Sequence, residues 1–388
     1  MSVTRPEGFI ASGIACGIKR TGDLDLSFVA STNGPIPVAA VFTTNRAAAA
    51  PVQLSRTHLE TTQGMARAVI LNSGCANAAT GAPGLSASRA TCKELARAIG
   101  AKEEEVLVCS TGLIGIPLEL EKITSHIDHL VKSAGPSRDD ARRAATAILT
   151  TDTHAKEVLI EADGFVVGGM AKGAGMIAPN MATMLVVLTT DAKVSPTQLS
   201  GALKSGVADT FNELIVDGCT STNDTVMIFA SGAAGAVDPG AFEDAVARAC
   251  AELAFLLAED AEGTTRVASI QVTRATSIAD AKLAGRQVAS SLLVKTSLFG
   301  SDPYWGRIVS ELGASGANFD IDLVSIAYGG VVVCRNGVET DHDSNAVRDH
   351  MQLSHVRVTC DLGLGVAEAT ILTTDLGHGY IDENMRTS

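Results

Sequence analysis

The chain has 388 residues, a formal net charge of −13 and a hydrophobic fraction of 46%, a composition typical of a globular protein and not of a disordered chain. The acidic balance argues against nucleic acid or an anionic membrane as the main partner, because both require basic patches. Aromatic residues make up only 4% of the chain, which also argues against base stacking. At this length the chain can hold two or three domains and bury a large core.

The cysteines and the apolar runs indicate where such a chain would reside. Eight cysteines are scattered without a C-x-x-C pair, so zinc ribbons, thioredoxin-type motifs and c-type haem attachment are excluded. We expect reduced thiols. The first twenty residues lack the basic and apolar regions of a signal peptide, and no apolar run reaches the length of a membrane span. The sequence therefore predicts a cytoplasmic protein.

Strand-like and helix-like segments alternate along the first half of the chain. Gly100 is a good C-cap for one of these helices, and Ser137 is a good N-cap for another, with acidic residues in its first turn. We predict strands at residues 27–31, 37–43, 66–71 and 105–109, and helices at residues 86–99, 117–132 and 137–149.

The second half gives sharper signals. The pairs Ser195-Pro196 and Asp238-Pro239 combine an N-cap with a proline at the first helical position, and each predicts a long helix. Asn336-Gly337 between apolar runs predicts a hairpin turn. Alternation with period two predicts strands at residues 265–273 and 355–360. The alternation along the whole chain predicts an α/β fold with sheets covered by helices.

Several familiar catalytic and binding motifs are absent. The sequence has no G-x-S-x-G elbow, no H-E-x-x-H pair and no G-x-x-x-x-G-K-[ST] phosphate loop. His126 and His129 share a helix face, but no nearby cysteine or carboxylate completes a metal site. We therefore interpret that pair as a solvated helix face and expect no metal.

The most unusual segment is FVVGGMAKGAGMIAPNMATMLVVLTTD at residues 165–191, where two apolar strands flank a glycine-rich loop that holds Lys172. Three interpretations remain open. The loop is a turn between core strands; or it binds an anion, although no helix follows it; or Thr183, at the start of the second strand, becomes an N-terminal nucleophile after chain cleavage. A free α-amine has a pKa of about 7.7–8.0, so it can serve as the general base for its own hydroxyl.

A short motif, Thr-Thr-Asp, occurs three times, at residues 150–152, 189–191 and 373–375. We interpret the second and third copies as punctuation between regular elements. The first copy lies between a predicted helix and the glycine-rich segment, and it is considered below.

Four motifs together are similar to those of one family. They are NSGCANAATG at residues 72–81, CSTGLIG at 109–115, MAKGAGMIAPNMATMLVVLTTD at 170–191 and KTSLFGSDPYWGRI at 295–308. The chain closely resembles the ornithine acetyltransferase family, also called glutamate N-acetyltransferase, the bifunctional type of arginine biosynthesis. The match runs in order from residues 8–26 to residues 375–384, so it is much more specific than any single motif.

The resemblance implies a self-processing enzyme. The chain would be cut between Ala182 and Thr183 into residues 1–182 and 183–388. Thr183 would take the acetyl group of N-acetylornithine as an ester and pass it to glutamate, in the cyclic pathway of arginine biosynthesis. Acetyl-CoA is a further possible acetyl donor, and no cofactor is implied. The implied fold is a layered α/β sandwich of two sheets between helices, of the N-terminal-nucleophile type, with a second smaller α/β lobe. The implied assembly is a heterotetramer of two cleaved protomers.

The resemblance also assigns site residues. Thr111 and Gly112 would form the oxyanion hole, although on sequence alone they fit an ordinary turn. Substrate contacts are implied for Lys172, Glu262 and Asn384, besides Thr183 itself. Two positions stay open. Thr150 of the first Thr-Thr-Asp is preferred, but Thr151 stays open because the segment up to Lys172 varies in length within the family. Ser388 is preferred, but Thr387 stays open because the C-terminal tail is shorter than is typical of the family and lacks its tyrosine.

Two other functions fit the same residues. An aminopeptidase or amidohydrolase would use the same N-terminal threonine with water as the acceptor. A non-catalytic protein would bind an anionic ligand at the glycine-rich loop, and its chain would stay intact.

Overall fold

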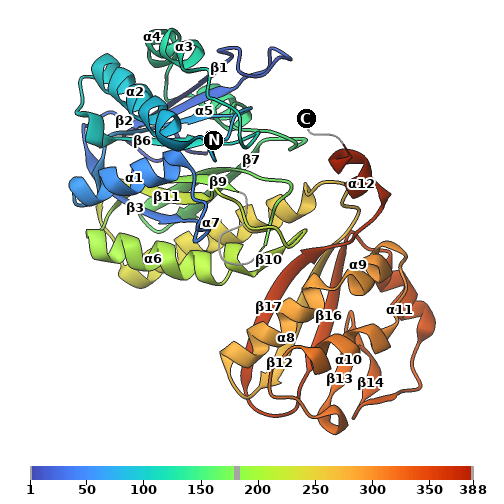
Figure 1. Ribbon diagram of the computed structural model, residues 1–388. Coiled ribbons are helices and arrows are strands. Elements are labelled where there is room, and N and C mark those ends of the chain that lie inside the picture. Colours follow the sequence, from blue (N-terminus) through green and yellow to red (C-terminus); the bar gives the residue numbers. More distant parts are fainter. Residues whose placement is uncertain (1, 179–183, 386–388) are drawn as a thin grey trace.

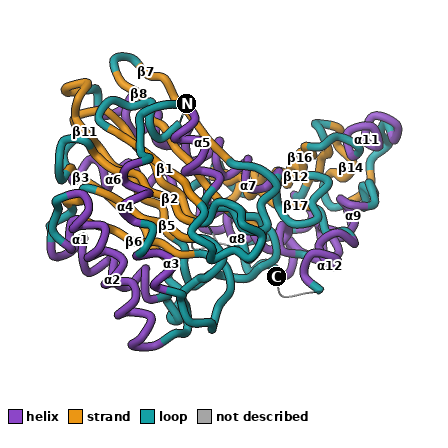
Figure 2. Tube along the Cα trace, turned by 90° about the horizontal axis from the view of Figure 1, so that it is seen from above, coloured by secondary structure: helices purple, strands orange, loops and turns teal. Residues whose placement is uncertain are grey.

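The computed structural model describes residues 2–178 and 184–385, and these form three β-sheets in two parts. Figure 1 shows a larger body built from the first two thirds of the chain and, beside it, a smaller lobe built from the last third. The view from above keeps the two parts side by side (Figure 2).

The body is a sandwich of two sheets. The four-stranded sheet has the order β1-β2-β5-β6, with β1 Phe9–Ile14, β2 Leu26–Ser31, β5 Ala68–Asn72 and β6 Val106–Ser110. The six-stranded sheet has the order β4-β3-β11-β9-β8-β7, with β4 Met65–Ala66, β3 Ile36–Phe42, β11 Thr225–Ala236, β9 Leu185–Lys193, β8 Phe165–Lys172 and β7 Lys156–Ala162.

Successive side chains of a strand point to opposite faces of the sheet, so each strand of the body contributes to two different hydrophobic clusters. Val69 and Leu71 of β5 belong to the buried cluster between the sheets, together with Val187 of β9, whereas Ile70 packs outward beneath helices. The helices α1 Ala50–Thr61, α2 Gly81–Ile99, α3 Leu120–Thr124 and α4 Ile127–Lys132 cover the four-stranded sheet, and α6 Pro196–Ala208 and α7 Pro239–Glu259 cover the six-stranded sheet.

Helix α5, Arg138–Thr146, packs directly on β1 at the edge of the sandwich. A Cβ at Gly13 would lie 2.1 Å from the Arg143 carbonyl oxygen, so β1 requires a glycine at this crossing. Ser137 caps α5 as predicted, with reciprocal hydrogen bonds between Ser137 and Asp140.

Most predicted elements of the body are confirmed. Gly100 adopts φ of 68° at the end of α2, and Ser195 and Asp238 each cap a helix that begins with proline. The single helix predicted at residues 117–132 is wrong, because α3 and α4 are separate short helices. The Ser125 hydroxyl donates to the Glu121 carbonyl at 2.6 Å, within the turn that ends α3.

The smaller lobe has one seven-stranded sheet of order β10-β17-β12-β16-β13-β14-β15. Its strands are β10 Leu214–Ile215, β17 Ala367–Thr374, β12 Val267–Ala275, β16 His355–Asp361, β13 Ser325–Tyr328, β14 Val331–Arg335 and β15 Val338–Glu339. Its core is completed by α8 Ile278–Ser290, α9 Leu292–Phe299, α10 Trp305–Ala314 and α11 Ser344–Met351.

Two features of the lobe matter below. Asn336-Gly337 forms the predicted hairpin turn between β14 and β15, with both residues at positive φ. The edge strand β10 comes from the middle of the chain, where it precedes β11 of the body, yet it pairs in parallel with β17. The two sheets between helices and the smaller lobe confirm the predicted fold class.

Strands β8 and β9 share one sheet. They pair antiparallel from Val167 opposite Thr190 to Lys172 opposite Leu185, and β9 also pairs in parallel with β11. The segments on the two sides of residues 179–183 are therefore parts of the same core, as expected for intertwined halves. All eight cysteines are free thiols. No described helix is long and apolar enough to cross a membrane.

Candidate functional site

Two of the predicted site residues lie at the ends of strands from different sheets. Thr111 follows β6, and Lys172 is the last residue of β8. Lys172 Nζ donates a 3.2 Å hydrogen bond to Thr111 Oγ1, and the two residues are only 2% and 4% exposed. A solvated loop lysine is therefore excluded. Since the Thr111 oxygen accepts from Lys172, the hydroxyl hydrogen of Thr111 is free for another acceptor.

The loop of Thr111 and Gly112 is held tightly against the neighbouring loop. Gly112 has φ of +122°, and a Cβ there would lie 2.4 Å from the Gly74 carbonyl carbon, so only glycine fits. The Thr111 N–H donates to the Asn72 carbonyl at 2.9 Å, while no described residue accepts from the Gly112 N–H. A rigid loop that leaves one N–H and one O–H unused has the chemistry of an oxyanion hole.

A buried ion cluster of Asp152, Lys156 and Asp260 lies next to Lys172. Lys156 Nζ lies 2.6 Å from Asp152 Oδ1 and 2.5 Å from Asp260 Oδ2, and these three side chains are at most 3% exposed. Asp152 Oδ1 also accepts the Gly173 N–H at 2.6 Å, and its Oδ2 lies 3.9 Å from Lys172 Nζ. The cluster therefore fixes the start of the glycine-rich loop.

Burial and charge act against each other in this cluster. Burial alone would raise the pKa of Asp152, but the adjacent Lys172 and Lys156 hold the pKa of that carboxyl well below its usual range. Burial lowers the pKa of Lys172, and the charge of Asp152 offsets part of that effect. Asp152 is therefore a carboxylate that stabilises a buried ammonium at Lys172.

The three Thr-Thr-Asp copies separate in the structure. Asp191 accepts the backbone N–H of Val166, and Asp375 accepts those of Thr265 and Arg266, as expected for structural punctuation. In the first copy, Asp152 Oδ2 accepts the Thr150 N–H at 3.0 Å and also lies 3.9 Å from Lys172 Nζ, so this copy borders the candidate site. Thr150 is half-buried and Thr151 is exposed; which of them contacts substrate stays a prediction.

Glu262 and Asn384 meet beside the glycine-rich loop. The Glu262 N–H donates to the Ala174 carbonyl at 2.9 Å, and a Cβ at Gly175 would lie 2.4 Å from Glu262 Oε2. Asn384, the last residue of α12 His378–Asn384, donates from Nδ2 to the same Oε2 at 2.8 Å. Figure 1 shows α12 returning from the smaller lobe towards the body. One loop thus connects Lys172 to the Glu262–Asn384 pair.

Four predicted site residues cannot be placed. Ala182, Thr183, Thr387 and Ser388 lie outside the described residues. The nearest described position is Met184, which leads directly into β9 at the sheet edge where Lys172 ends β8.

Comparison with known proteins identifies the chain's relatives. Residues 10–387 match the ArgJ family. The chain belongs to the ArgJ family. It is 44% identical over 385 residues to the arginine biosynthesis bifunctional protein ArgJ of Thermobifida fusca, covering 99% of each chain. It is 45% identical over 389 residues to the protein of that name from Mycolicibacterium paratuberculosis, covering 98% of this chain and 95% of that one.

Two solved structures are also similar. Bacillus halodurans ArgJ is 32% identical with a TM-score of 0.49, covering 51% of this chain and 96% of that one. Mycobacterium tuberculosis ornithine acetyltransferase, solved with ornithine, is 40% identical with a TM-score of 0.44, covering 47% of this chain and 96% of that one. Family membership identifies this ArgJ-family chain as an acyltransferase.

Sequence reasoning missed two polar residues of this ArgJ-family site. Asn223 Nδ2 donates to the carbonyls of Ala76 at 2.7 Å and Ser110 at 2.9 Å, and so joins the loop that holds Thr111 to the loop that follows Asn72. Asp224 is fully buried, and its Oδ1 accepts the Met184 N–H at 3.1 Å. The one available signal was a polar pair directly before the apolar strand β11.

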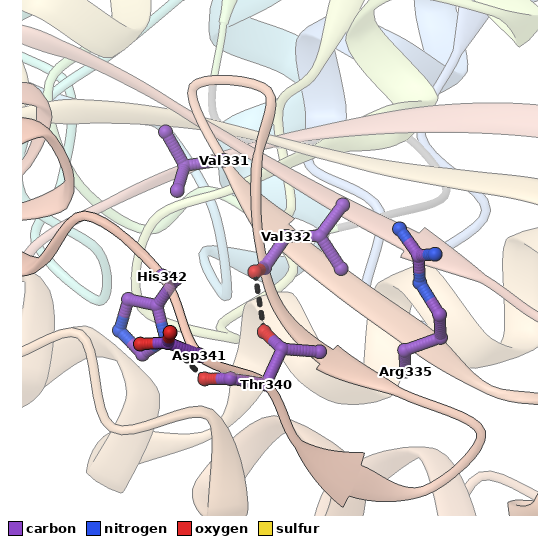
Figure 3. A pocket seen from close by; sticks show the side chains of 6 residues that line it. All are labelled: Val331, Val332, Arg335, Thr340, Asp341 and His342. Atoms are coloured by element: carbon purple, nitrogen blue, oxygen red, sulfur yellow. Dashed lines mark hydrogen bonds between the residues drawn. The ribbon is translucent and has the colours of Figure 1, made fainter.

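A cavity of about 410 Å³ lies in the smaller lobe against β14, lined by Val331, Val332, Arg335, Thr340, Asp341 and His342 (Figure 3). Figure 3 shows these six side chains and the hydrogen bond that the Thr340 hydroxyl donates to the Val332 carbonyl. We assign no function to it. Within the described residues, no three histidine, cysteine or acidic side chains are grouped to hold a metal.

Proposed function

We propose that this chain is a self-processing acetyltransferase that moves the acetyl group of N-acetylornithine to glutamate through an ester on Thr183. The observation that carries the proposal is the Lys172–Thr111 contact of 3.2 Å beside the unused Gly112 N–H. This contact lies at the sheet edge where β8 ends and β9 begins, and Met184, which directly follows Thr183 in the chain, leads into β9 there.

Self-processing would cut the Ala182–Thr183 bond and give chains of residues 1–182 and 183–388. The new α-amine of Thr183, with a pKa of about 7.7–8.0, would then accept the proton of its own hydroxyl. Pairing of β8 with β9 and of β3 with β11 supports association of the two products, because in each pair one strand comes from each product.

The transfer would proceed in two balanced steps. The Thr183 oxygen attacks the acetyl carbon, its proton passes through the α-amine to the departing nitrogen, and ornithine leaves. The amine of glutamate then attacks the ester carbon, and Thr183 recovers its proton. Each step passes through a tetrahedral oxyanion, for which the Thr111 O–H and the Gly112 N–H are the donors we propose.

The charged groups suit the two substrates. We propose that Glu262, held by Asn384, binds the side-chain ammonium of ornithine, and that Lys172 binds a substrate carboxylate. Thr150 and Ser388 would complete the contacts. We propose no cofactor, since side chains supply every group that these steps need. Use of acetyl-CoA as a second donor, a cytoplasmic location and a heterotetramer of two cleaved protomers stay predictions.

The test is the intact mass of the purified wild type, Thr183→Ser and Thr183→Ala. We expect two fragments from the wild type and from the serine variant, which keeps a hydroxyl, and one 39.8 kDa chain from the alanine variant. Transfer from N-acetylornithine is then measured with and without glutamate. Acetate release that does not depend on glutamate would favour a hydrolase, and an intact wild-type chain would overturn self-processing.

A further inference from the structure

Asp224 holds the chain directly after Thr183. Its Oδ1 accepts the Met184 N–H at 3.1 Å, and the N–H of the next residue, Thr225, donates to the Met184 carbonyl at 3.1 Å. Met184 is therefore fixed on both its donor and its acceptor side by the start of β11. Because this amide nitrogen is bonded to the carbonyl carbon of Thr183, Asp224 contacts the chain one residue after the proposed cleavage position.

The second oxygen of this carboxyl is unused. Asp224 Oδ2 is buried and has no hydrogen-bond partner among the described residues. Buried polar atoms without a partner are rare in native proteins. Other buried aspartates are satisfied, as at Asp191, where the two oxygens accept the N–H groups of Glu7 and Val166. Among the buried aspartates that the structure describes, Asp224 alone has a buried oxygen without a partner.

The surroundings of Asp224 favour a carboxyl that keeps its proton. Burial raises the pKa of Asp224 well above its usual range, although the Met184 N–H and the Lys172 charge each lower it. The Ser221 hydroxyl also lies close enough to lower this pKa, but its geometry does not satisfy Oδ2 as a hydrogen-bond partner. Within the described part of the chain no lysine, arginine or histidine forms an ion pair with Asp224, since Lys172 Nζ is directed to Thr111 and Asp152. A protonated Oδ2 is a hydrogen-bond donor that needs an acceptor.

We propose that Asp224 transfers protons during self-cleavage at Ala182–Thr183, with Oδ1 fixing Met184 while Oδ2 serves the reacting atoms. This inference rests on the proposed function. The Thr183 hydroxyl oxygen bonds to the Ala182 carbonyl carbon, and Oδ2 gives its proton to the Thr183 nitrogen as the carbon–nitrogen bond breaks. The hydroxyl proton then passes to the Asp224 carboxylate. The ester and the free amine are the products, and water hydrolyses the ester.

The variant that separates this role from a structural one is Asp224→Asn. Asparagine keeps an oxygen that can accept the Met184 N–H, but it cannot give up and recover a proton. A purely structural Asp224 would therefore tolerate asparagine. The matched control is Asp191→Asn, which alters another buried aspartate of the same sheet, near the opposite end of β9.

The measurement is the rate of fragment formation after a short pulse of cell-free synthesis, for the wild type and both variants, with the unfolding temperature of each. We expect Asp224→Asn to cut at least about 10²-fold more slowly than the wild type, with the unfolding temperature of the Asp191→Asn control or higher. Cutting of Asp224→Asn within twofold of the wild type would overturn this inference alone. A wild type that stays intact would overturn it together with the proposed function.

Discussion

The buried ion cluster behind Lys172 gives the sharpest prediction of stability. Lys156→Met removes the ammonium that lies 2.6 Å from Asp152 and 2.5 Å from Asp260, with the three side chains at most 3% exposed. The carboxylates of Asp152 and Asp260 would stay buried without the positive charge of Lys156 beside them. Removing one partner of a buried pair costs about 3–5 kcal/mol, and we expect a loss of unfolding free energy in that range.

The matched control is Arg97→Met, which removes a cation at the same kind of distance but at the surface. Arg97 lies 3.0 Å from Asp128, and each side chain is 59% exposed, so we expect a much smaller loss of unfolding free energy than for Lys156→Met. Both changes are made in Thr183→Ala, so that a single chain unfolds, and are measured by urea denaturation followed by circular dichroism. Adding Asp260→Asn to Lys156→Met should restore part of the loss. Equal losses for Lys156→Met and Arg97→Met would refute the reasoning.

Three further predictions concern the site and the smaller lobe. Thr111→Val should lower kcat of acetyl transfer by about 10²–10³-fold, measured by steady-state kinetics, because it removes one of the two oxyanion donors that we propose; an unchanged kcat would exclude that role. Gly175→Ala should lower kcat/KM at least about tenfold, since its Cβ would lie 2.4 Å from Glu262 Oε2, while Gly201→Ala, with open space in α6, should not. Burial lowers the pKa of Lys295 from 10.5 to about 7. The unfolded chain then binds more protons between these values, so this group makes stability rise with pH from about 7 to 10. Unfolding temperatures across that range should show a smaller rise in Lys295→Met; an equal rise would contradict the shift.

The elements that the sequence predicted well are those with local causes. Ser137, Ser195 and Asp238 cap their helices through their own side chains, and Asn336-Gly337 makes its hairpin with two residues at positive φ. Such signals act within a few residues and can be read without the rest of the fold.

The pairing of strands had no such local cause. Strands β2 and β3 are neighbours in the chain, yet β2 joins the four-stranded sheet and β3 pairs with β11 in the other. That choice depends on which apolar faces meet across the sandwich. For the same reason β10, only two residues long, could not be assigned to the smaller lobe from its sequence.

The candidate site divides in a similar way. Resemblance predicted Thr111, Lys172, Glu262 and Asn384, and the structure places them along one loop system. It did not predict Asp224, because a polar residue before a strand is typical of any loop. Only burial and the unused Oδ2 distinguish it. A chain pattern shows which residue types are present, but it does not show which polar atoms lack a partner.

The origin of β10 has a consequence for motion between the two parts. A lobe joined to a body by a single linker can rotate as a rigid body. Here the smaller lobe is connected to the larger body at two places: the chain runs from α7 to β12, and β10, which precedes β11 of the body, pairs with β17 of the lobe. Buried Lys295 stabilises the pairing of β10 with β17, since its Nζ donates to the Thr374 carbonyl at 2.7 Å and lies 3.5 Å from the Ile215 carbonyl oxygen. Two separated anchors suppress hinge rotation about either one. Opening for substrate exchange would then come from loop movement at the strand ends, and a chain truncated after α7 would expose the apolar edge residues Leu214 and Ile215.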